Sequence, residues 1–219
     1  MRASLDTNVI IHFYRAGLQN IMFDFFKDGV FIYEQIRNVE LENHGQDILK
    51  LVDEDIAAGK IEIYTNDKLR NKSVFKIFEN NVRENKLLYD SGDMGEVYAI
   101  ALAQTLGTYS LVTDDIKQGG PYMSLLQIYD DIRPFNFADI LIIRYLMGTV
   151  DEYQTVEDFN NINEKSELNW SFRSHLKRFI RRFFTDPDRT DDYEWMQGII
   201  KENGIKVKSR FERLRRLVI

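Results

Sequence analysis

Four sets of acidic residues follow predicted strands or open predicted helices in the first 120 residues. They are Asp6, then Glu40 with Glu34 and Glu42 nearby, then Asp93 with Glu96, and finally Asp114 with Asp115. The segments that follow parallel strands emerge at one edge of the sheet, so these carboxylates can meet there. Mg²⁺ and Mn²⁺ prefer oxygen ligands, and a bound cation relieves the repulsion between neighbouring carboxylates. The pattern predicts a site for one or two such ions.

Each of these acids also has a simpler interpretation. Asp6 can cap the helix that follows it, because its side chain can accept from a free backbone N–H. Glu40 can be a solvated residue of a helix. Asp93 and Glu96 suit the first turn of a helix, where negative charge is favourable, and the acids at 114–115 suit a turn. We prefer the metal site because all four sets fall at the same predicted edge.

The elements that must position these acids alternate between strands and helices. Strands are predicted at a segment ending at Leu5 and at 30–33, 61–64, 109–113 and 132–137. Helices are predicted at 9–14, 18–26, 34–42, 45–59, 67–86 and 97–104, and a further helix after the turn at 119–121 reaches about residue 129. This alternation predicts an α/β fold with a parallel sheet of four or five strands covered by helices.

The last part of the chain differs from this body in charge and in pattern. From residue 171 to the end there are 13 Lys and Arg against 7 Asp and Glu, net +6, whereas residues 1–170 carry −12. After an apolar helix that ends near 148, residues 150–169 are polar and expected to be partly loop, and helices follow at 172–184, 195–200 and 207–214. We therefore predict a domain at 1–149 and a helical extension at 150–219.

The basic helices of the extension have three interpretations. They can present a solvated face over an apolar stripe. They can contact RNA phosphates, in which case Arg173, Lys177 and Arg181 are the candidate substrate-binding residues. Their apolar side can instead dock a protein partner.

The motifs of the first 137 residues resemble those of PIN-domain nucleases. The resemblance is carried by Leu5-Asp-Thr-Asn8, Glu40-Leu41, Asp93-Met-Gly-Glu96 before an Ala-rich helix, and Leu111-Val-Thr-Asp-Asp115. It implies a parallel α/β/α sandwich and metal-dependent cleavage of RNA. It implies that Asp6, Glu40, Glu96 and Asp115 are the catalytic metal ligands, helped by Asp93 and Asp114, with Asn8 in support. Glu40 comes about one residue later than the family's second acid, so Glu34 and Glu42 are alternatives, and the C-terminal extension lies outside the family pattern.

Composition and motifs exclude several other classes. The chain has no cysteine, so it has no disulfide or thiolate metal site. It shows no signal peptide and no apolar run of membrane-spanning length, so we expect a soluble, cytoplasmic protein without a membrane partner. His12, His44 and His175 lack metal-ligand spacing and are interpreted as structural or exposed. No glycine-rich phosphate loop with a lysine occurs.

We therefore expect a metal-dependent endoribonuclease with Mg²⁺ or Mn²⁺ as cofactor and RNA as substrate. Many bacterial relatives in the family are toxins of toxin–antitoxin pairs, so an antitoxin-like protein and a second copy of the chain are candidate partners. The alternative is a catalytically silent PIN-like module that binds protein or RNA through its helical extension. A phosphatase is a more distant alternative, because the sequence after Asp6 lacks a second aspartate two residues on.

Overall fold

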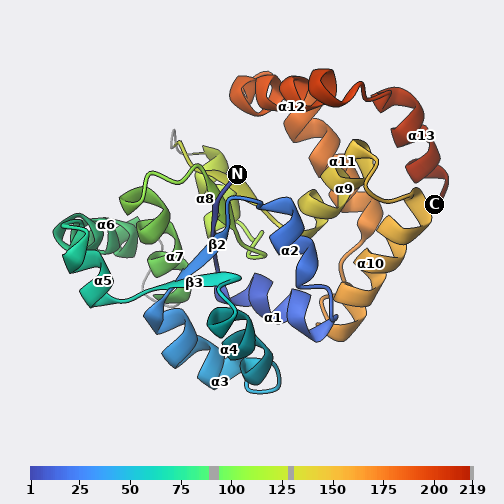
Figure 1. The fold of residues 1–219 in the computed structure, drawn as a ribbon. Helices are drawn as coiled ribbons and strands as arrows, with labels where there is room; N and C mark the ends of the chain where they lie inside the picture. Colours follow the sequence, from blue (N-terminus) through green and yellow to red (C-terminus); the bar gives the residue numbers. More distant parts are fainter. Residues whose placement is uncertain (89–93, 128–130, 218–219) are drawn as a thin grey trace. The chain divides into compact units, whose positions relative to one another are not determined.

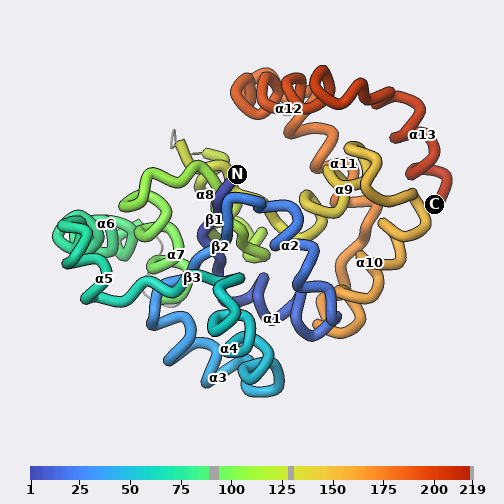
Figure 2. Tube along the Cα trace, viewed as in Figure 1, coloured from blue at the N-terminus to red at the C-terminus, as the bar shows by residue number. Residues whose placement is uncertain are grey.

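The computed structural model describes residues 1–88, 94–127 and 131–217, and it divides into two compact units, residues 1–136 and 137–219. The apolar helix at 137–147 therefore belongs to the second unit, whereas the predicted boundary at 149/150 assigned it to the first. Figure 1 shows the elements of both units as a ribbon, and Figure 2 shows the same view as a trace. None of the helices formed by the described residues is both long and apolar enough to span a membrane.

The first unit is an α/β fold around a five-stranded, all-parallel sheet with the strand order β3-β2-β1-β4-β5. The strands are β1 (Ala3–Leu5), β2 (Val30–Tyr33), β3 (Ile61–Tyr64), β4 (Ser110–Val112) and β5 (Arg133–Phe135). This confirms the predicted parallel sheet and the short last strand. The order of the strands could not be predicted from the alternation alone.

Every residue of β1, β2 and β4 is buried, which shows that both faces of the sheet are covered by helices. The connections after β1 and β2 contain α1 (Thr7–Arg15), α2 (Asn20–Phe25), the π-helix η1 (Ile36–Leu41), α3 (Glu42–His44) and α4 (Leu49–Ala57). The connections after β3 and β4 contain α5 (Asn66–Asn71), α6 (Phe75–Leu88), α7 (Met94–Thr105) and α8 (Pro121–Gln127). The first group of connections leads from β1 outward to β2 and β3, and the second leads back in the opposite direction to β4 and β5. Because both are right-handed crossovers, the two groups lie on opposite faces of the sheet.

The core on the α5–α7 face is aromatic at its centre. Phe31 and Tyr33 alternate along β2 and so point to the same face, where they pack with Tyr64, Phe78 and the small Ala101 of α7. Figure 1 shows α5, α6 and α7 grouped on one side of β2. The alanines of α7 allow this helix to lie close to β1, and the Ser4 hydroxyl donates to the Ala99 carbonyl at 2.8 Å.

The second unit is helical throughout its described residues. It contains α9 (Phe137–Met147), α10 (Glu152–Lys165), α11 (Phe172–Ile180), the π-helix η2 (Arg181–Thr185), α12 (Thr190–Asn203) and α13 (Val207–Leu217). Nearly every residue of α9 is buried, and α10, α11 and α12 pack against it, so α9 is the central helix of this unit. Helix α10 occupies the polar stretch that we expected to be partly loop.

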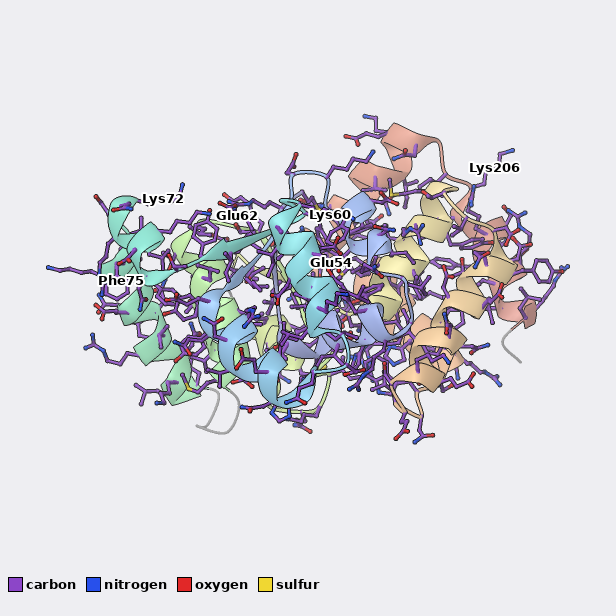
Figure 3. The ribbon with its side chains drawn as sticks, turned by 60° about the horizontal axis from the view of Figure 1, so that its bottom comes forward. Glu54, Lys60, Glu62, Lys72, Phe75 and Lys206 are labelled. Carbon is purple, nitrogen blue, oxygen red and sulfur yellow. The ribbon has the colours of Figure 1, made fainter. Side chains whose placement is uncertain are left out.

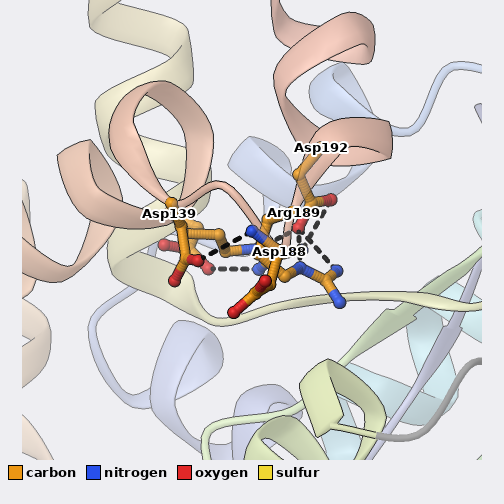
Figure 4. A network of polar contacts seen from close by, with 6 residues as sticks. Asp139, Asp188, Arg189 and Asp192 are labelled. Carbon is orange, nitrogen blue, oxygen red and sulfur yellow. Dashed lines mark hydrogen bonds and ion pairs between the residues drawn. The ribbon is translucent and has the colours of Figure 1, made fainter.

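A buried ion network joins three elements of the second unit (Figure 4). The Arg182 side chain on η2 contacts Asp192 of α12, with Nε 2.7 Å from Oδ2, and lies 3.5 Å from Asp139 Oδ2 of α9. Arg189 donates a second set of hydrogen bonds to Asp192. Arg182, Asp192 and Asp139 are each at most 3% exposed, so the charges compensate one another in the interior.

Candidate functional site

The central pair of strands, β1 and β4, marks the point where the strand order reverses direction. The chain leaves β1 toward β2 on one side, whereas β4 lies on the other side and leads to β5. The connections after β1 and β4 therefore leave on opposite faces of the sheet. In open α/β sheets, this switch point is the usual ligand-binding position. Asp6 and the segment 113–115 directly follow these two strands.

Asp6 is held at this edge by contacts from both neighbouring segments. Its backbone N–H donates to the Val112 carbonyl at 2.9 Å, which continues the β1–β4 pairing by one residue. Its Oδ1 accepts from the Thr7 N–H at 2.7 Å, so Asp6 caps α1, as the simpler interpretation predicted. Its Oδ2 accepts from the Thr113 hydroxyl at 3.0 Å. The carboxylate is thus a helix cap and also a buried group at the switch point, only 1% exposed.

Thr113 connects Asp6 to the acidic segment that follows β4. Besides donating to Asp6, its hydroxyl accepts from the Asp115 N–H at 3.2 Å. Its own N–H donates to the Phe135 carbonyl of β5 at 2.8 Å, which fixes the backbone at this position. Because Leu5 pairs in register with Val112, Thr113 lies opposite Asp6. One hydroxyl therefore joins the ends of the two central strands.

Asp114 and Asp115 are oriented differently. The Asp114 side chain is fully buried, and its Oδ2 accepts from His12 Nδ1 of α1 at 2.7 Å. The Asp115 carboxylate turns into its own loop, where Oδ2 lies 2.6 Å from Lys117 Nζ and Oδ1 accepts from the Lys117 N–H. Gly120 packs against it, since a Cβ at that residue would lie 2.6 Å from Asp115 Oδ1. Asp114 is therefore the acid tied to α1, and Asp115 is the acid tied to the loop.

Glu96 and Glu40 lie on two elements that contact each other. Glu96 is in the first turn of α7 and is 5% exposed, and α7 packs against β1, β2, β4 and η1. Glu40 lies on η1 and is half-buried. Its charge, together with burial as the larger cause, raises the pKa of Tyr98, which is two residues beyond Glu96. The negative charge of Glu40 is therefore close to the first turns of α7.

The π-helical form of η1 bears on the spacing of Glu40. A π-turn holds one more residue than an α-turn, and such turns often occur at functional sites. The predicted second acid, Glu40, comes about one residue late relative to the family pattern. Glu40 lies within η1, near its C-terminal end at Leu41.

The two alternatives to Glu40 have other roles. Glu34 Oε1 accepts from the Asn66 N–H at the start of α5, at 2.9 Å. Glu42 forms an exposed ion pair with Arg37, which also binds Asp53. Of these glutamates, Glu40 is the one whose charge reaches α7. Asn8 is half-buried in the first turn of α1, and Asp93 lies outside the described residues.

The fit of these residues to a divalent cation is partial. Within the described residues, no three His, Asp or Glu side chains converge closely enough to hold a metal ion as they stand. The donors that gather at the switch point are nevertheless hard oxygens, the type that Mg²⁺ and Mn²⁺ take. In addition, Thr7 Oγ1 is buried beside Asp6 and has no hydrogen-bond partner among the described residues. Buried hydroxyls are normally satisfied, so a water, ion or phosphate oxygen at this edge would complete its contacts.

The three candidate substrate-binding residues lie on the second unit. Arg173 and Lys177 are exposed on α11, and Arg181 is exposed at the start of η2. Each of these residues lies about one helical turn after the previous one. Arg181 Nε lies 3.4 Å from Asp186 Oδ2. Exposed cations in a row provide affinity for phosphates without selecting a sequence, and their role as substrate contacts stays a prediction.

Sequence reasoning missed two residues of this edge, Thr113 and His12. Thr113 directly precedes the paired acids, but its role depends on the β1–β4 register, which requires the strand order. His12 was interpreted as structural or exposed, yet its ring binds Asp114. A signal was present, because His12 lies four residues after Asn8 and so shares a face of α1 with it.

Comparisons with protein-family models, curated proteins and solved structures found no match to this chain.

Proposed function

We propose that the chain is a PIN-like, metal-dependent endoribonuclease whose site is the edge formed by Asp6, Glu40, Glu96 and the segment 113–115. The observation that carries this proposal is the joining of Asp6 to Thr113 at the switch point of a parallel sheet. Buried carboxylates follow β1 (Asp6) and β4 (Asp114), and a third (Glu96) lies in the first turn of α7, which packs against both strands.

The residues at this edge have distinct proposed roles. Asp6, Glu40, Glu96 and Asp115 would hold the cation, with Asp114 as a further carboxylate. A bound divalent cation supplies an activated water and stabilises the charge that develops on the phosphate. Thr113 orients Asp6 through its hydroxyl, and His12 orients Asp114 through Nδ1. The burial of Asp6, Glu96 and Asp114 keeps their charge from being screened by bulk water.

Asp6→Asn tests the proposal with little risk to the fold. Asparagine caps helices as well as aspartate does, so α1 keeps its N-terminal hydrogen bond. Loss of a ligand charge is expected to lower cleavage of single-stranded RNA in Mn²⁺ by about 100-fold or more. Asp67→Asn removes an exposed charge from α5 and serves as the control. Equal cleavage by wild type and Asp6→Asn, with the control also active, would exclude Asp6 as the metal ligand.

A second candidate function is a silent module that binds protein or RNA without hydrolysis. The observation that favours it is that protein groups already contact two of the predicted ligands. Lys117 pairs with Asp115, and His12 binds Asp114. Calorimetric titration with Mn²⁺ separates the two functions. Submillimolar binding that is lost in Asp6→Asn and Asp115→Asn supports the nuclease, and no binding in the wild type supports the silent module. A role as the toxin of a toxin–antitoxin pair stays a prediction.

A further inference from the structure

A cavity of about 220 Å³ opens in the second unit, between the end of α9, the end of α12 and the first turns of α13. Its polar lining consists of Asn203, Lys206, Ser209, Arg210 and Arg213. Three of these side chains are cationic, and no lining residue is acidic. Pockets for drug-sized ligands occupy roughly 300–1,000 Å³, so this cavity suits a smaller, negatively charged group.

Tyr145 of α9 lies close to two of the cations that line the cavity, Arg210 and Arg213. Arg210 Nη1 donates to the Tyr145 carbonyl at 2.5 Å, and the guanidinium lies over the tyrosine ring, 5.4 Å from its centroid. The Tyr145 hydroxyl donates to the Arg210 carbonyl at 2.9 Å, and Arg213 is near enough to oppose the rise that burial causes in the pKa of this hydroxyl. Because Tyr145 is fully buried, Arg210 is anchored to a rigid group. Fixed cations lose less entropy when they bind a ligand.

Gly148 leaves the space that Arg210 occupies. Its φ is +80°, a left-handed conformation that glycine adopts without strain. A Cβ at this residue would lie 3.0 Å from Arg210 Nη2. The turn after α9 therefore allows the guanidinium to lie against the backbone, beside the cavity.

The cations of the cavity differ from the other arginines of the same unit in how their charge is balanced. Arg182 and Arg189 contact the carboxylate of Asp192 (Figure 4). By contrast, no carboxylate among the described residues lies within 4.0 Å of Lys206, Arg210 or Arg213. Glu152 is near enough to raise the pKa of Tyr145, a smaller cause than burial, but it does not line the cavity.

Cations near the last carbonyls of α9 could simply stabilise that helix end. This explains Arg210, which donates to the Tyr145 carbonyl. It does not explain Lys206, whose side chain forms no hydrogen bond with the described residues of α9 and lies at the surface of the unit in Figure 3. Arg213 is near the tyrosine hydroxyl, where its charge opposes the rise in pKa that burial causes, and it forms no hydrogen bond with the described carbonyls of α9. Two of the three charges therefore remain available to a ligand.

We propose that this cavity binds a phosphate group. Guanidinium groups match phosphate oxygens with paired N–H donors, and a lysine adds a point charge. Ser209 and Asn203 supply neutral polar groups at the same wall. The phosphate can belong to an RNA end or to a free phosphate compound. The proposal is independent of the acidic edge of the first unit, because no residue of that edge is involved.

The test measures binding of inorganic phosphate and of two RNA hexamers, one with a 5′-phosphate and one with a 5′-hydroxyl, by calorimetry in EDTA. Chelation prevents phosphate from binding through a metal at the acidic edge. The full-length wild type is expected to bind phosphate saturably. The double variant Lys206→Gln/Arg213→Gln is expected to bind at least about tenfold more weakly, since charged hydrogen bonds are lost. Preference for the 5′-phosphorylated hexamer over free phosphate identifies an RNA end as the source, and equal binding identifies a free phosphate compound.

The matched control is Lys208→Gln/Arg215→Gln, which removes two exposed charges from α13 that do not line the cavity. It is expected to bind phosphate as the wild type does. Lys206→Gln alone, at an exposed residue, gives a second variant if the double variant does not fold, and it is expected to weaken binding severalfold. Asp6→Asn is expected to leave phosphate binding unchanged, so a failed nuclease proposal would not affect this result. No saturable binding by the wild type, or equal weakening in the control, would overturn the proposal.

Discussion

At the scale of single residues, Thr113 connects three segments through its hydroxyl and its backbone. It donates to the carboxylate of Asp6 and accepts from the Asp115 N–H, while its backbone N–H pairs with β5. Thr113 itself is fully buried, so water cannot replace a lost contact without entering the interior. The hydroxyl of Thr113 therefore connects the carboxyl ends of β1 and β4.

Replacing Thr113 with valine keeps the shape of the side chain and removes the hydroxyl. We expect the free energy of unfolding to fall by about 1–3 kcal/mol, because the buried Asp6 carboxylate loses a donor. Thr113→Ser keeps the Oγ and should remain within about 1 kcal/mol of the wild type. Urea denaturation of the three proteins measures both effects. A valine variant as stable as the serine variant would contradict this assignment.

His175 is a buried histidine of the second unit that should make stability depend on pH. Its ring stacks on Trp170, 4.5 Å between centroids, and it is 5% exposed. Burial, and to a smaller extent the charge of Arg178, lowers its pKa from 6.5 to about 4. The folded protein therefore keeps this ring neutral at a pH at which the unfolded chain protonates it.

The sign of the pH effect follows from this lowered pKa. Below pH 6.5 the unfolded state binds a proton at His175, whereas the folded state does not. The free energy of unfolding therefore falls with decreasing pH until about pH 4. The full effect is about 3 kcal/mol, from about 1.4 kcal/mol per pKa unit. We expect His175→Phe to lose this slope while keeping the aromatic stack. Urea denaturation between pH 4.5 and 7.5 compares the two slopes, and equal slopes would show that another group titrates.

At the scale of elements, α10 shows how a polar sequence can form a regular helix. Its buried residues Thr155, Asp158, Phe159 and Ile162 follow helical spacing, but only two of them are apolar. The helix begins after Asp151, whose backbone is extended. The Asp151 side chain caps the helix, because Oδ1 accepts from the Gln154 N–H at 2.8 Å. Capping and packing on α9 therefore compensate for a weak apolar stripe.

Asp151→Ala should destabilise α10 selectively. Loss of an N-cap side chain costs about 1 kcal/mol, whereas Asp151→Asn keeps the acceptor and should cost little. Amide hydrogen exchange is expected to become faster in the first turns of α10 in the alanine variant alone. If exchange in α10 is unchanged in the alanine variant, the cap does not limit the opening of this helix.

At the scale of the whole molecule, the two units should respond separately to damage in one of them. Arg182→Met would leave the buried carboxylates of Asp139 and Asp192 with less compensation, at a cost of about 3–5 kcal/mol. We expect hydrogen exchange to accelerate in α9, η2 and α12 and to stay unchanged in β1 and β4. Arg173→Met, at an exposed residue, is the control. Faster exchange in β1 and β4 as well would show that the units unfold together.

The sequence predicted much of this organisation where a signal was local. β2 is a short apolar run directly after Gly29, and β3 is a short, mostly apolar segment shortly after Gly59; both glycines have positive φ. The cap at Asp6 was equally evident. The strand order, the contact between Asp6 and Thr113, and the contact between His12 and Asp114 were not, because each joins segments about 100 residues apart. Such pairings depend on the energy of the complete fold, which no local pattern records.

The separation of Asp6 and Thr113 has a consequence for how the protein is made. The two residues are 107 positions apart, so the edge that they share cannot close until β4 has left the ribosome and inserted beside β1. Contacts of such long range are generally slow to form, because the loop between them must first be ordered. Nascent chains that stop before residue 110 would contain Asp6 without its partner strand. If the edge is catalytic, a cell that synthesises this protein is exposed to its activity only after translation has passed the midpoint of the chain.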